Sequence, residues 1–490
     1  MSLPFRTLCL TPLLLVPFAS PVVAAAEENT ALPIDEVRLF AEIFGGIKNY
    51  YVDDVSDKKL IENAIKGMVS GLDPHSSFLD EKGYKDLQES TSGEFGGLGI
   101  EVTKDPQGVR VVTPIDDTPA ARAGVLAGDI IIKIDGKVSA DQSLDENVKM
   151  MRGKPGTSIT LTIARKGAHK PVVITLVRDI IKIRSVKSKA LSDHIGYIRI
   201  TQFQGKTTGD FSRALGDLLK DTKLKGIVLD LRNNPGGLLN AAIGVSAAFI
   251  SEGLPVVSTK GRIKSSDRIF KATYKDYVVG KEGDELKGLP SKAKTIPVVV
   301  LVNSASASAS EIVSGALQDH KRATIMGTRS FGKGSVQTII PLRMKNRETL
   351  GIKMTTARYY TPSGRSIQAT GIVPDIAVDD TPEGNYPSFA IREADLSGHI
   401  EAEKAEKKNP VKEREDEEET EGTVPTLRYT FGDEKDFPLK QAVNHLLGNP
   451  VITHADIQRT KKEAAAAKKA KAEKEGKSKE KKTDSKKPAK

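Results

Sequence analysis

The sequence predicts a multidomain α/β protein with helical segments at both ends. With 490 residues, the chain is too long for one compact hydrophobic core. Within residues 34–91 apolar side chains recur at helix spacing, for example at Val37, Phe40 and Phe44. Within residues 181–375 apolar strand-like runs alternate with helix-like segments, a pattern typical of an α/β domain.

Residues 1–26 have the pattern of a secretory signal peptide. Arg6 supplies a positive charge, residues 8–18 form an apolar stretch, and residues 24–26 are alanines that suit cleavage. The apolar stretch is short for a membrane span and is interrupted by proline, although an uncleaved anchor is the alternative interpretation. We therefore expect an exported protein of the periplasm or cell envelope.

The mature chain is expected to hold no thiol. The only cysteine, Cys9, lies inside the signal peptide. Disulfides, cysteine metal clusters and cysteine nucleophiles are therefore excluded from the expected chemistry.

The net charge of +10 is concentrated at the C-terminus. Residues 459–490 hold 14 basic against 5 acidic residues, a net of +9, and Arg6 supplies the remaining +1. The body of the chain is near neutral, so we expect no nucleic-acid partner. Such a tail is typical of a solvated, disordered segment, and attraction to anionic envelope surfaces is its functional alternative.

Composition and pattern divide the chain into six segments. The signal peptide is followed by a helical segment broken at residues 71–74, a region of short β-type runs, the α/β domain, a C-terminal segment with a charged linker, and the basic tail. Their expected boundaries are residues 1–26, 27–92, 93–180, 181–380, 381–458 and 459–490. The strands expected in the α/β domain are Ile195–Ile200, Gly226–Leu231, Ile296–Val302 and Ala323–Met326.

The C-terminal segment contains two recognisable features. Residues 401–421 form a dense Lys/Glu run, which reads as a linker or an exposed helix. Phe437–Leu447 is expected to form a last amphipathic helix before the tail.

A serine-rich turn is expected between a buried strand and a helix. Residues 303–310 are small and polar, and Glu311–His320 shows helix periodicity. A hydroxyl at a helix N-terminus gains from unpaired N–H groups and from the helix dipole, and such donors also bind the oxyanion of acyl transfer. Several serines compete for this role, and ordinary helix capping is the alternative interpretation.

A nucleophilic serine needs a base, and Lys333 is the best placed candidate. The one histidine nearby is His320, on the following helix, whereas Lys333 lies between two glycines that let another element approach. Complete burial lowers the pKa of an ammonium by up to ~3–5 units, and a neutral amine then accepts the serine proton. Gln337 shares the parity of Lys333 and Ser335, so a regular strand would place it to orient the amine.

The same segment also imitates a phosphate-binding loop. Residues 327–333 match the first seven positions of the pattern G-x-x-x-x-G-K. However, Gly334 stands where a Ser or Thr would hold magnesium, and Val336–Ile340 reads as a strand instead of the helix that cradles phosphate. The sequence therefore disfavours a nucleotide-dependent enzyme.

Three stretches together resemble the carboxyl-terminal processing peptidases, PDZ-containing serine proteases of peptidase family S41. They are NSASASASEIVSGALQD at residues 303–319, RATIMGTRSFGKGSVQ at residues 322–337 and IVLDLRNNPGGL at residues 227–238. The family nucleophile is the middle serine of S-A-S-A-S-E, with its lysine 25 positions later and a glutamine four further on. The resemblance implies Ser308, Lys333 and Gln337 as catalytic residues. It also implies a protease core similar to the ClpP/crotonase fold.

The family places an oxyanion donor in a glycine-rich turn, which residues 233–237 match. Successive backbone N–H groups in such a turn form an anion-binding concavity. We favour the amide of Gly237 over that of Gly236, with the amide of Ala309 as the second donor. An ordinary loop after a strand is the alternative interpretation.

Residues 96–102, 118–129 and 134–136 resemble a bacterial PDZ domain inserted before the protease core. In such a domain a glycine-rich loop captures a terminal carboxylate and the adjacent strand edge pairs with an extended peptide. The expected groove helix is Asp145–Met151. The resemblance implies peptide-binding roles for Gly97, Leu98, Gly99, Ile100, Val148 and Met151. Arg165 occupies a position similar to the gating arginine of the family, with a surface ion pair as the alternative.

The resemblance implies a serine endopeptidase that cleaves exported proteins at or near their C-termini, without metal or organic cofactor. It also implies a homo-oligomer and an activator or adaptor protein. A rival interpretation is an inactive PDZ adaptor on a protease-like fold. The intact set of Ser308, Lys333 and Gln337 argues against that rival.

Overall fold

The computed structural model describes residues 33–463 and 466, except for 116, 281–282, 343–348, 386–390, 403–431 and 434. The expected signal peptide with Cys9, most of the charged run and most of the basic tail lie outside these residues. The chain falls into two compact units, one ending at Ile65 and one beginning at Lys66.

The N-terminal segment is helical, as expected. Its helices are α1 (Ile34–Tyr50), α2 (Asp57–Ser70) and α3 (Glu81–Ser92), and the break expected at residues 71–74 follows the end of α2. Helix α1 buries none of its residues. Among the described helices, none combines the length and apolar character that crossing a bilayer requires.

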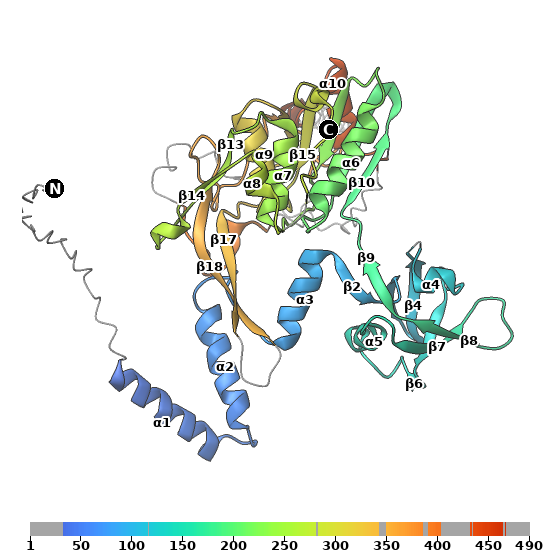
Figure 1. The fold of residues 1–490 in the computed structure, drawn as a ribbon, viewed down its shortest axis with the longest axis vertical. Coiled ribbons are helices and arrows are strands. Elements are labelled where there is room, and N and C mark those ends of the chain that lie inside the picture. Colours follow the sequence, from blue (N-terminus) through green and yellow to red (C-terminus); the bar gives the residue numbers. More distant parts are fainter. Residues whose placement is uncertain are drawn as a thin grey trace, which may run out of the picture. The chain divides into compact units, whose positions relative to one another are not determined.

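A small β-rich module follows, in which hydrogen-bonded neighbours are all antiparallel (Figure 1). Its core is formed by side chains such as Val111, Ile131 and Leu161, each fully buried. The sheet runs in the order β3 (Ile100–Asp105), β4 (Gly108–Pro114), β5 (Ile130–Ile134), β7 (Ser158–Ala164) and β8 (Val172–Val177), with β6 (Lys137–Val138) paired to β5. The module also contains helices α4 (Pro119–Arg122) and α5 (Leu144–Met151). Strands β2 (Glu94–Gly97) and β9 (Asp179–Lys182) pair where the chain enters and leaves it.

The α/β core contains a six-stranded sheet that is parallel except at its β10 edge. Its order is β10 (Val186–Ala190), β11 (Ile195–Ile200), β12 (Gly226–Asp230), β15 (Val298–Val302), β16 (Thr324–Gly327) and β19 (Ile376–Ala377). The four strands expected from the sequence are β11, β12, β15 and β16, and their bounds differ from expectation by two residues at most. Each of these parallel strands is joined to the next by a crossover that carries one or more helices, as α/β folds require.

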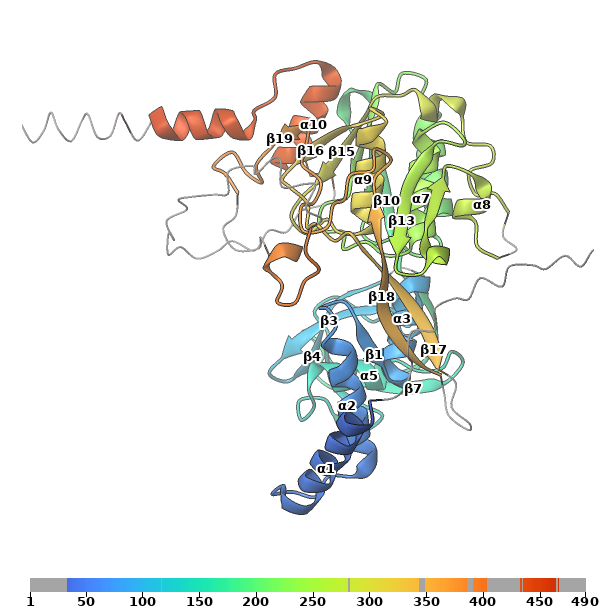
Figure 2. The same ribbon diagram turned by 90° about the vertical axis from the view of Figure 1, so that its left-hand side faces the viewer.

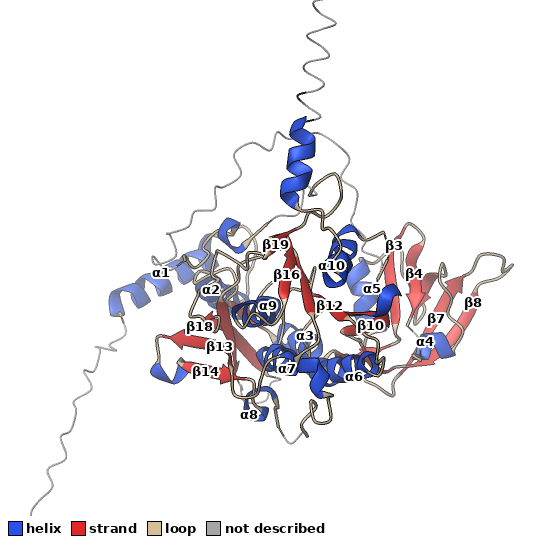
Figure 3. Cartoon of the chain, turned by 90° about the horizontal axis from the view of Figure 1, so that it is seen from above, coloured by secondary structure: helices blue, strands red, loops and turns tan. Residues whose placement is uncertain are grey.

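Both faces of this sheet are buried. Side chains of one parity, such as Leu229 and Val300, pack against α6 (Thr207–Leu219), α7 (Leu239–Phe249) and α9 (Ala309–Asp319). Those of the other parity, such as Val228 and Leu301, pack against the C-terminal helix α10 (Phe437–Leu447). Figure 3 shows α10 on one side of β12 and β16 and the helices α7 and α9 on the other. Such two-sided burial explains why these strands read as continuous apolar runs.

A second sheet completes the core. Its order is β1 (Ser77–Leu79), β18 (Leu350–Tyr360), β13 (Pro255–Gly261) and β14 (Arg268–Lys271), and β17 (Ser335–Leu342) also pairs with β18. Strands β17 and β18 form a long antiparallel pair, drawn in orange in Figure 2. Because β17 is a strand, the helix that a phosphate-binding loop needs is not there, as the sequence predicted.

Candidate active site

The candidate site lies where parallel strands of the core sheet end. The carboxyl ends of β11, β12, β15 and β16 share one edge of the sheet, which is where α/β folds place their ligand sites. Backbone hydrogen bonds of 2.9–3.0 Å tie the loops at this edge to one another. They join Ala307 to Asn234, Phe331 to Ser306, and Phe203 to Gly236.

Ser308 lies in a strained backbone turn at the start of α9. Its φ of 53° and ψ of −111° lie in a region that residues with side chains rarely adopt. The next residue, Ala309, is the first of the helix, so Ser308 stands beside N–H groups that have no intrahelical partner. A serine in a strained turn between a strand and a helix is the arrangement of a nucleophile elbow.

Burial sets two of the four serines of this turn apart from the others. Ser306 is fully buried and its hydroxyl donates to Leu231 O at 2.9 Å. Ser310 is also fully buried and its hydroxyl donates to Asn234 O at 2.9 Å. Ser308 is half-buried, and within the described residues its hydroxyl donates to no carbonyl oxygen. Ser306 and Ser310 therefore serve the loop structure. Ser304 is half-buried like Ser308, and Ser308 also forms a capping box with Glu311 at the start of α9, as the capping alternative expects.

Lys333 lies on the loop between β16 and β17, and its flanking glycines allow close packing. A Cβ on Gly334 would lie 2.6 Å from Gln368 N, and one on Gly332 would lie 3.1 Å from Gly371 N. The distance at Gly334 is too short for a real side chain, and the one at Gly332 is tight, at a residue whose φ of 98° also favours glycine. The expectation that these glycines let another element approach the lysine is confirmed.

The pKa of Lys333 is lowered to about 8, mainly by burial and to a smaller extent by the positive charge of Lys353. The carboxylates of Glu393, Glu311 and Asp73 oppose this shift because they favour the ammonium form. At pH 7 a lysine with this pKa is neutral in roughly one molecule in ten. Lys333 is therefore able to act as a proton acceptor near neutral pH.

Glu311 connects the serine turn to the lysine loop. It is 1% exposed, and burial raises the pKa of its carboxyl to about 7 although four hydrogen bonds oppose the shift. Its donors are the N–H groups of Ser308 at 2.7 Å, Gly332 at 2.7 Å and Lys333 at 3.0 Å, and the hydroxyl of Ser330 at 2.6 Å. One carboxyl group thus fixes the backbone of both candidate catalytic residues. We did not infer this role from the sequence, although Glu311 ends the S-A-S-A-S-E motif.

The glycine turn packs directly against Ser308. A Cβ on Gly236 would lie 2.8 Å from Ser308 Cβ and 2.9 Å from Ala309 N. The N–H of Gly236 is occupied, because it donates to Asn234 Oδ1 at 2.9 Å. Within the described part of the chain, no acceptor binds the N–H of Gly237 or of Ala309. The turn therefore leaves two unoccupied donors, those of Gly237 and Ala309.

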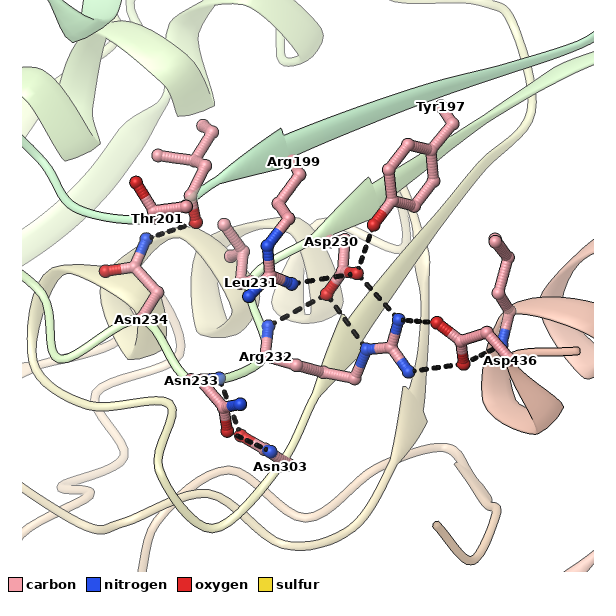
Figure 4. Close-up of polar contacts among 12 residues, drawn as sticks. Tyr197, Arg199, Thr201, Asp230, Leu231, Arg232, Asn233, Asn234, Asn303 and Asp436 are labelled. Carbon is pink, nitrogen blue, oxygen red and sulfur yellow. Dashed lines mark hydrogen bonds and ion pairs between the residues drawn. The ribbon is translucent and has the colours of Figure 1, made fainter. Parts of the chain in front are cut away.

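A buried ionic network holds this glycine turn to the sheet (Figure 4). Arg232 is 1% exposed and lies between two carboxylates, Asp230 of β12 and Asp436, the residue before α10. Its guanidinium donates to Asp436 at 2.7 and 2.5 Å and to Asp230 at 3.0 and 2.7 Å. Tyr197 donates its hydroxyl hydrogen bond to Asp230, and Arg199 forms an ion pair with the same carboxylate at 3.1 Å. Although burial opposes the shift, the charge of Arg232 lowers the pKa of Asp230 to about 2.

Gln337 lies near the lysine loop but its amide is directed elsewhere. It donates to Ser335 Oγ at 3.0 Å and to Thr355 Oγ1 at 3.2 Å. A register shift between Val336 and Gln337 interrupts the pairing with β18, so the regular strand assumed for the parity argument does not extend to Lys333. The proposed contact between Gln337 and the lysine amine stays a prediction.

His320, the histidine nearest to the serine turn in sequence, caps the C-terminal end of α9, and its ring contacts a different part of the core. Its Nε2 lies 2.7 Å from Pro255 O, in the second sheet. This contact accounts for the ring in structural terms.

The glycine-rich loop of the β-module has free donors. Gly97 ends β2, and Ile100 begins β3. The N–H groups of Leu98 and Gly99 between them bind no acceptor within the described residues. Gly99 has a φ of 76°, and a Cβ there would lie 2.3 Å from Thr118 Cβ, so only glycine fits.

The expected groove helix is α5, and its apolar residues differ in exposure. Met151 is 5% exposed and Leu98 is 2% exposed, so both belong to the core of the module. Val148 and Ile100 are half-buried and pack against this core, and their peptide-binding role stays a prediction. Arg165 forms an ion pair within this module, donating to both carboxylate oxygens of Asp129 at 2.7–2.8 Å. Asp129 is 2% exposed, so Arg165 pairs with a buried carboxylate, and its gating role stays a prediction.

Comparison with known proteins identifies the class. The sequence profile of peptidase family S41 matches residues 194–378, that of the PDZ domain matches residues 96–176, and that of the activating protease CtpB N-terminal domain matches residues 20–83. The chain is 50% identical over 391 residues to a carboxy-terminal-processing protease of Bartonella bacilliformis, covering 79% of this chain and 85% of the relative. The chain belongs to the carboxy-terminal-processing proteases, serine peptidases of family S41 with a PDZ domain.

Further relatives agree with this assignment. A probable CtpA-like serine protease of Staphylococcus haemolyticus is 36% identical over 363 residues, which is 74% of this chain and 68% of the relative. Among solved structures, the photosystem II D1 C-terminal processing protease is 29% identical, with a TM-score of 0.39, over 74% of this chain and 98% of that one. The matches to the family S41 and PDZ-domain profiles confirm the mixed α/β protease core and the PDZ module expected from the sequence.

Proposed function

We propose that this chain is an exported endopeptidase that cleaves proteins at or near their C-termini, with Ser308 as nucleophile and Lys333 as general base. The observation that carries the proposal is the shared attachment of both residues to Glu311. The strained turn at Ser308 and the lowered pKa of Lys333, about 8, support it further.

The reaction follows from these positions. The neutral amine of Lys333 takes the proton of the Ser308 hydroxyl while the oxygen attacks the carbonyl carbon of the scissile bond. The free N–H groups of Gly237 and Ala309 donate to the developing oxyanion. The lysine ammonium then gives its proton to the leaving amine. Water hydrolyses the acyl-enzyme by the same sequence, and Gln337 positions the lysine.

The central test is degradation of an unstructured substrate such as casein. Ser308→Ala and Lys333→Ala should each lower turnover by about 10⁴-fold or more, with unchanged thermal unfolding. Ser304→Ala is the matched control in the same turn and should retain activity. Because only the neutral amine accepts a proton, wild-type turnover should rise with pH through about 8. Substantial cleavage by Ser308→Ala, or a flat profile between pH 6 and 9, would contradict the proposal.

We further propose that the PDZ domain selects substrates by their C-terminal carboxylate. The free N–H groups of Leu98 and Gly99 support this, because such donors capture a terminal carboxylate while the strand edge pairs with the peptide. Peptide binding to the full-length Ser308→Ala protein measures it. Amidation of the peptide C-terminus should weaken binding at least about tenfold. Equal affinity of the acid and the amide would remove this part of the proposal.

The remaining expectations concern context. We propose that residues 1–26 direct export to the periplasm or cell envelope, that the mature chain forms a homo-oligomer, and that an activator or adaptor protein assists it. The segment boundaries at residues 92, 180, 380 and 458 belong to the same proposal. N-terminal sequencing of the protein from the cell envelope should begin after Ala26.

A further inference from the structure

The loop that carries Lys333 is held by a segment far beyond the catalytic motifs. Residues 391–402 follow the core, and the backbone N–H of Glu393 in this segment donates to Phe331 O at 3.1 Å. Phe331 lies two residues before Lys333. This segment is therefore hydrogen-bonded to the Lys333 loop on the N-terminal side of the lysine.

The side chain of Glu393 reaches the other side of the same loop through Gln368. Its Oε1 accepts from Gln368 Nε2 at 2.9 Å, and Gln368 Oε1 accepts from the N–H of Gly334 at 2.8 Å. Both Glu393 and Gln368 are 0% exposed. Glu393 thus binds the chain before Lys333 directly, at Phe331, and the chain after Lys333 through the side-chain amide of Gln368.

A third contact joins Glu393 to the N-terminal helical segment. His75, in the loop between α2 and β1, lies with Nε2 2.7 Å from Glu393 Oε2. The same loop carries Asp73, whose carboxylate accepts from the hydroxyls of Ser76 and Thr355. Three segments distant in sequence therefore meet around the lysine loop.

The charge of Glu393 acts on the amine of Lys333. Burial alone would raise the pKa of Glu393, but the hydrogen bonds from His75 and Gln368 outweigh it and lower that pKa, so the side chain is an anion at neutral pH. This anion favours the ammonium form of Lys333, against burial and Lys353. The other charged groups that act on the amine are Glu311 and Asp73.

We propose that Glu393 is a positioning residue for the general base, fixing the Lys333 loop from both sides and holding a negative charge near its amine. This inference rests on the proposed role of Lys333 in the reaction, which it deepens. Glu393 contacts neither the nucleophile nor the oxyanion donors in the described residues, so it acts through the lysine loop alone.

The test measures the titration of Lys333 without relying on catalysis. Full-length Ser308→Ala protein is labelled with trace acetic anhydride at a series of pH values, and acetylation of Lys333 is quantified by mass spectrometry. In Ser308→Ala/Glu393→Gln the midpoint for Lys333 should move toward acid by about 1 pH unit, since one stabilising anion near the ammonium is lost. Glu401→Gln, an exposed glutamate of the same segment, is the matched control and should leave the midpoint in place.

A second variant separates the effect of the length of the Glu393 side chain from the effect of its negative charge. Glu393→Asp keeps the anion but shortens the side chain by one methylene, so it should retain the Lys333 midpoint while lowering casein turnover about tenfold or more. It also serves as the test if Glu393→Gln fails to fold. Identical Lys333 midpoints in the Glu393→Gln and parent proteins, or full turnover by Glu393→Asp, would overturn the inference. Neither outcome depends on whether Lys333→Ala is inactive, so failure of the proposed function is recognised separately.

Discussion

Removal of Asp436 is the sharpest test of how the core holds the glycine turn. The network contains two cations, the buried Arg232 and the partly exposed Arg199, and two buried anions, Asp230 and Asp436. It is therefore neutral as a whole. Asp436→Ala gives the network a net charge of +1 and removes one of the two carboxylates that pair with Arg232, which is 1% exposed.

The expected cost follows from that burial. Breaking a buried pair by deleting one partner costs about 3–5 kcal/mol, because the remaining charge stays out of water. Asp436 also caps α10 by accepting from Leu439 N at 3.2 Å, and losing a cap costs about 1 kcal/mol. Together these costs give an expected loss of about 5 kcal/mol. A loss of that size lowers the melting temperature of a domain of this size by roughly 10–20 °C.

Calorimetry on the inactive Ser308→Ala background, which prevents self-digestion, measures the shift. The matched control is Asp217→Ala, which deletes the partner of Lys220 in an exposed pair 2.7 Å apart and should cost under about 1 kcal/mol. Asp436→Asn retains the shape of the side chain and should fall between the two. A melting point for Asp436→Ala within about 3 °C of the parent, no more than the exposed control allows, would refute the reasoning.

Two further predictions concern the site. Gly236→Ala should lower turnover about 10²-fold or more, because the φ of Gly236 is 101° and the new Cβ would lie 2.8 Å from Ser308 Cβ. The control is Gly216→Ala, whose Cβ would meet nothing nearer than 4.0 Å. Equal turnover of the two variants would contradict the packing argument. Glu311→Gln should flatten the dependence of the unfolding free energy on pH. In the wild-type protein folding raises the pKa of the Glu311 carboxyl from 4.5 to about 7, so the protonated carboxyl stabilises the fold fully below pH 4.5. This contribution of about 3 kcal/mol is lost as the pH rises through 7. Urea unfolding at pH 4.5 and 8 measures the difference, and parallel changes in the two proteins would count against it.

The sequence predicted those parts of the molecule that depend on local patterns. Apolar runs marked the strands because both faces of the parallel sheet are covered, as at Val300 and Leu301. The break after α2 and the last helix at Phe437–Leu447 were also predictable, since proline and glycine end one helix and Asp436 begins the other. The spacing between the motifs singled out Ser308 and Lys333 by resemblance.

The sequence could not show which distant side chains meet. Asp436 pairs with Arg232 across 204 positions, and Glu393 meets His75 across 318. No periodicity connects residues so far apart, and each of these carboxylates reads locally as a solvated charge. The parity argument for Gln337 has a separate limit, because parity along a strand is informative only where the pairing is regular and the register shifts between Val336 and Gln337.

The Arg232–Asp436 pair also orders events during synthesis of the chain. Domains generally fold as units while the N-terminal part emerges first. Until residue 436 has been added, the turn at Gly236 and Gly237 is anchored to an arginine that lacks one of its two carboxylates. A nascent or truncated polypeptide therefore carries Ser308 and Lys333 without the fully supported turn beside them. The glycine turn is therefore fully supported only once Asp436 has joined the fold.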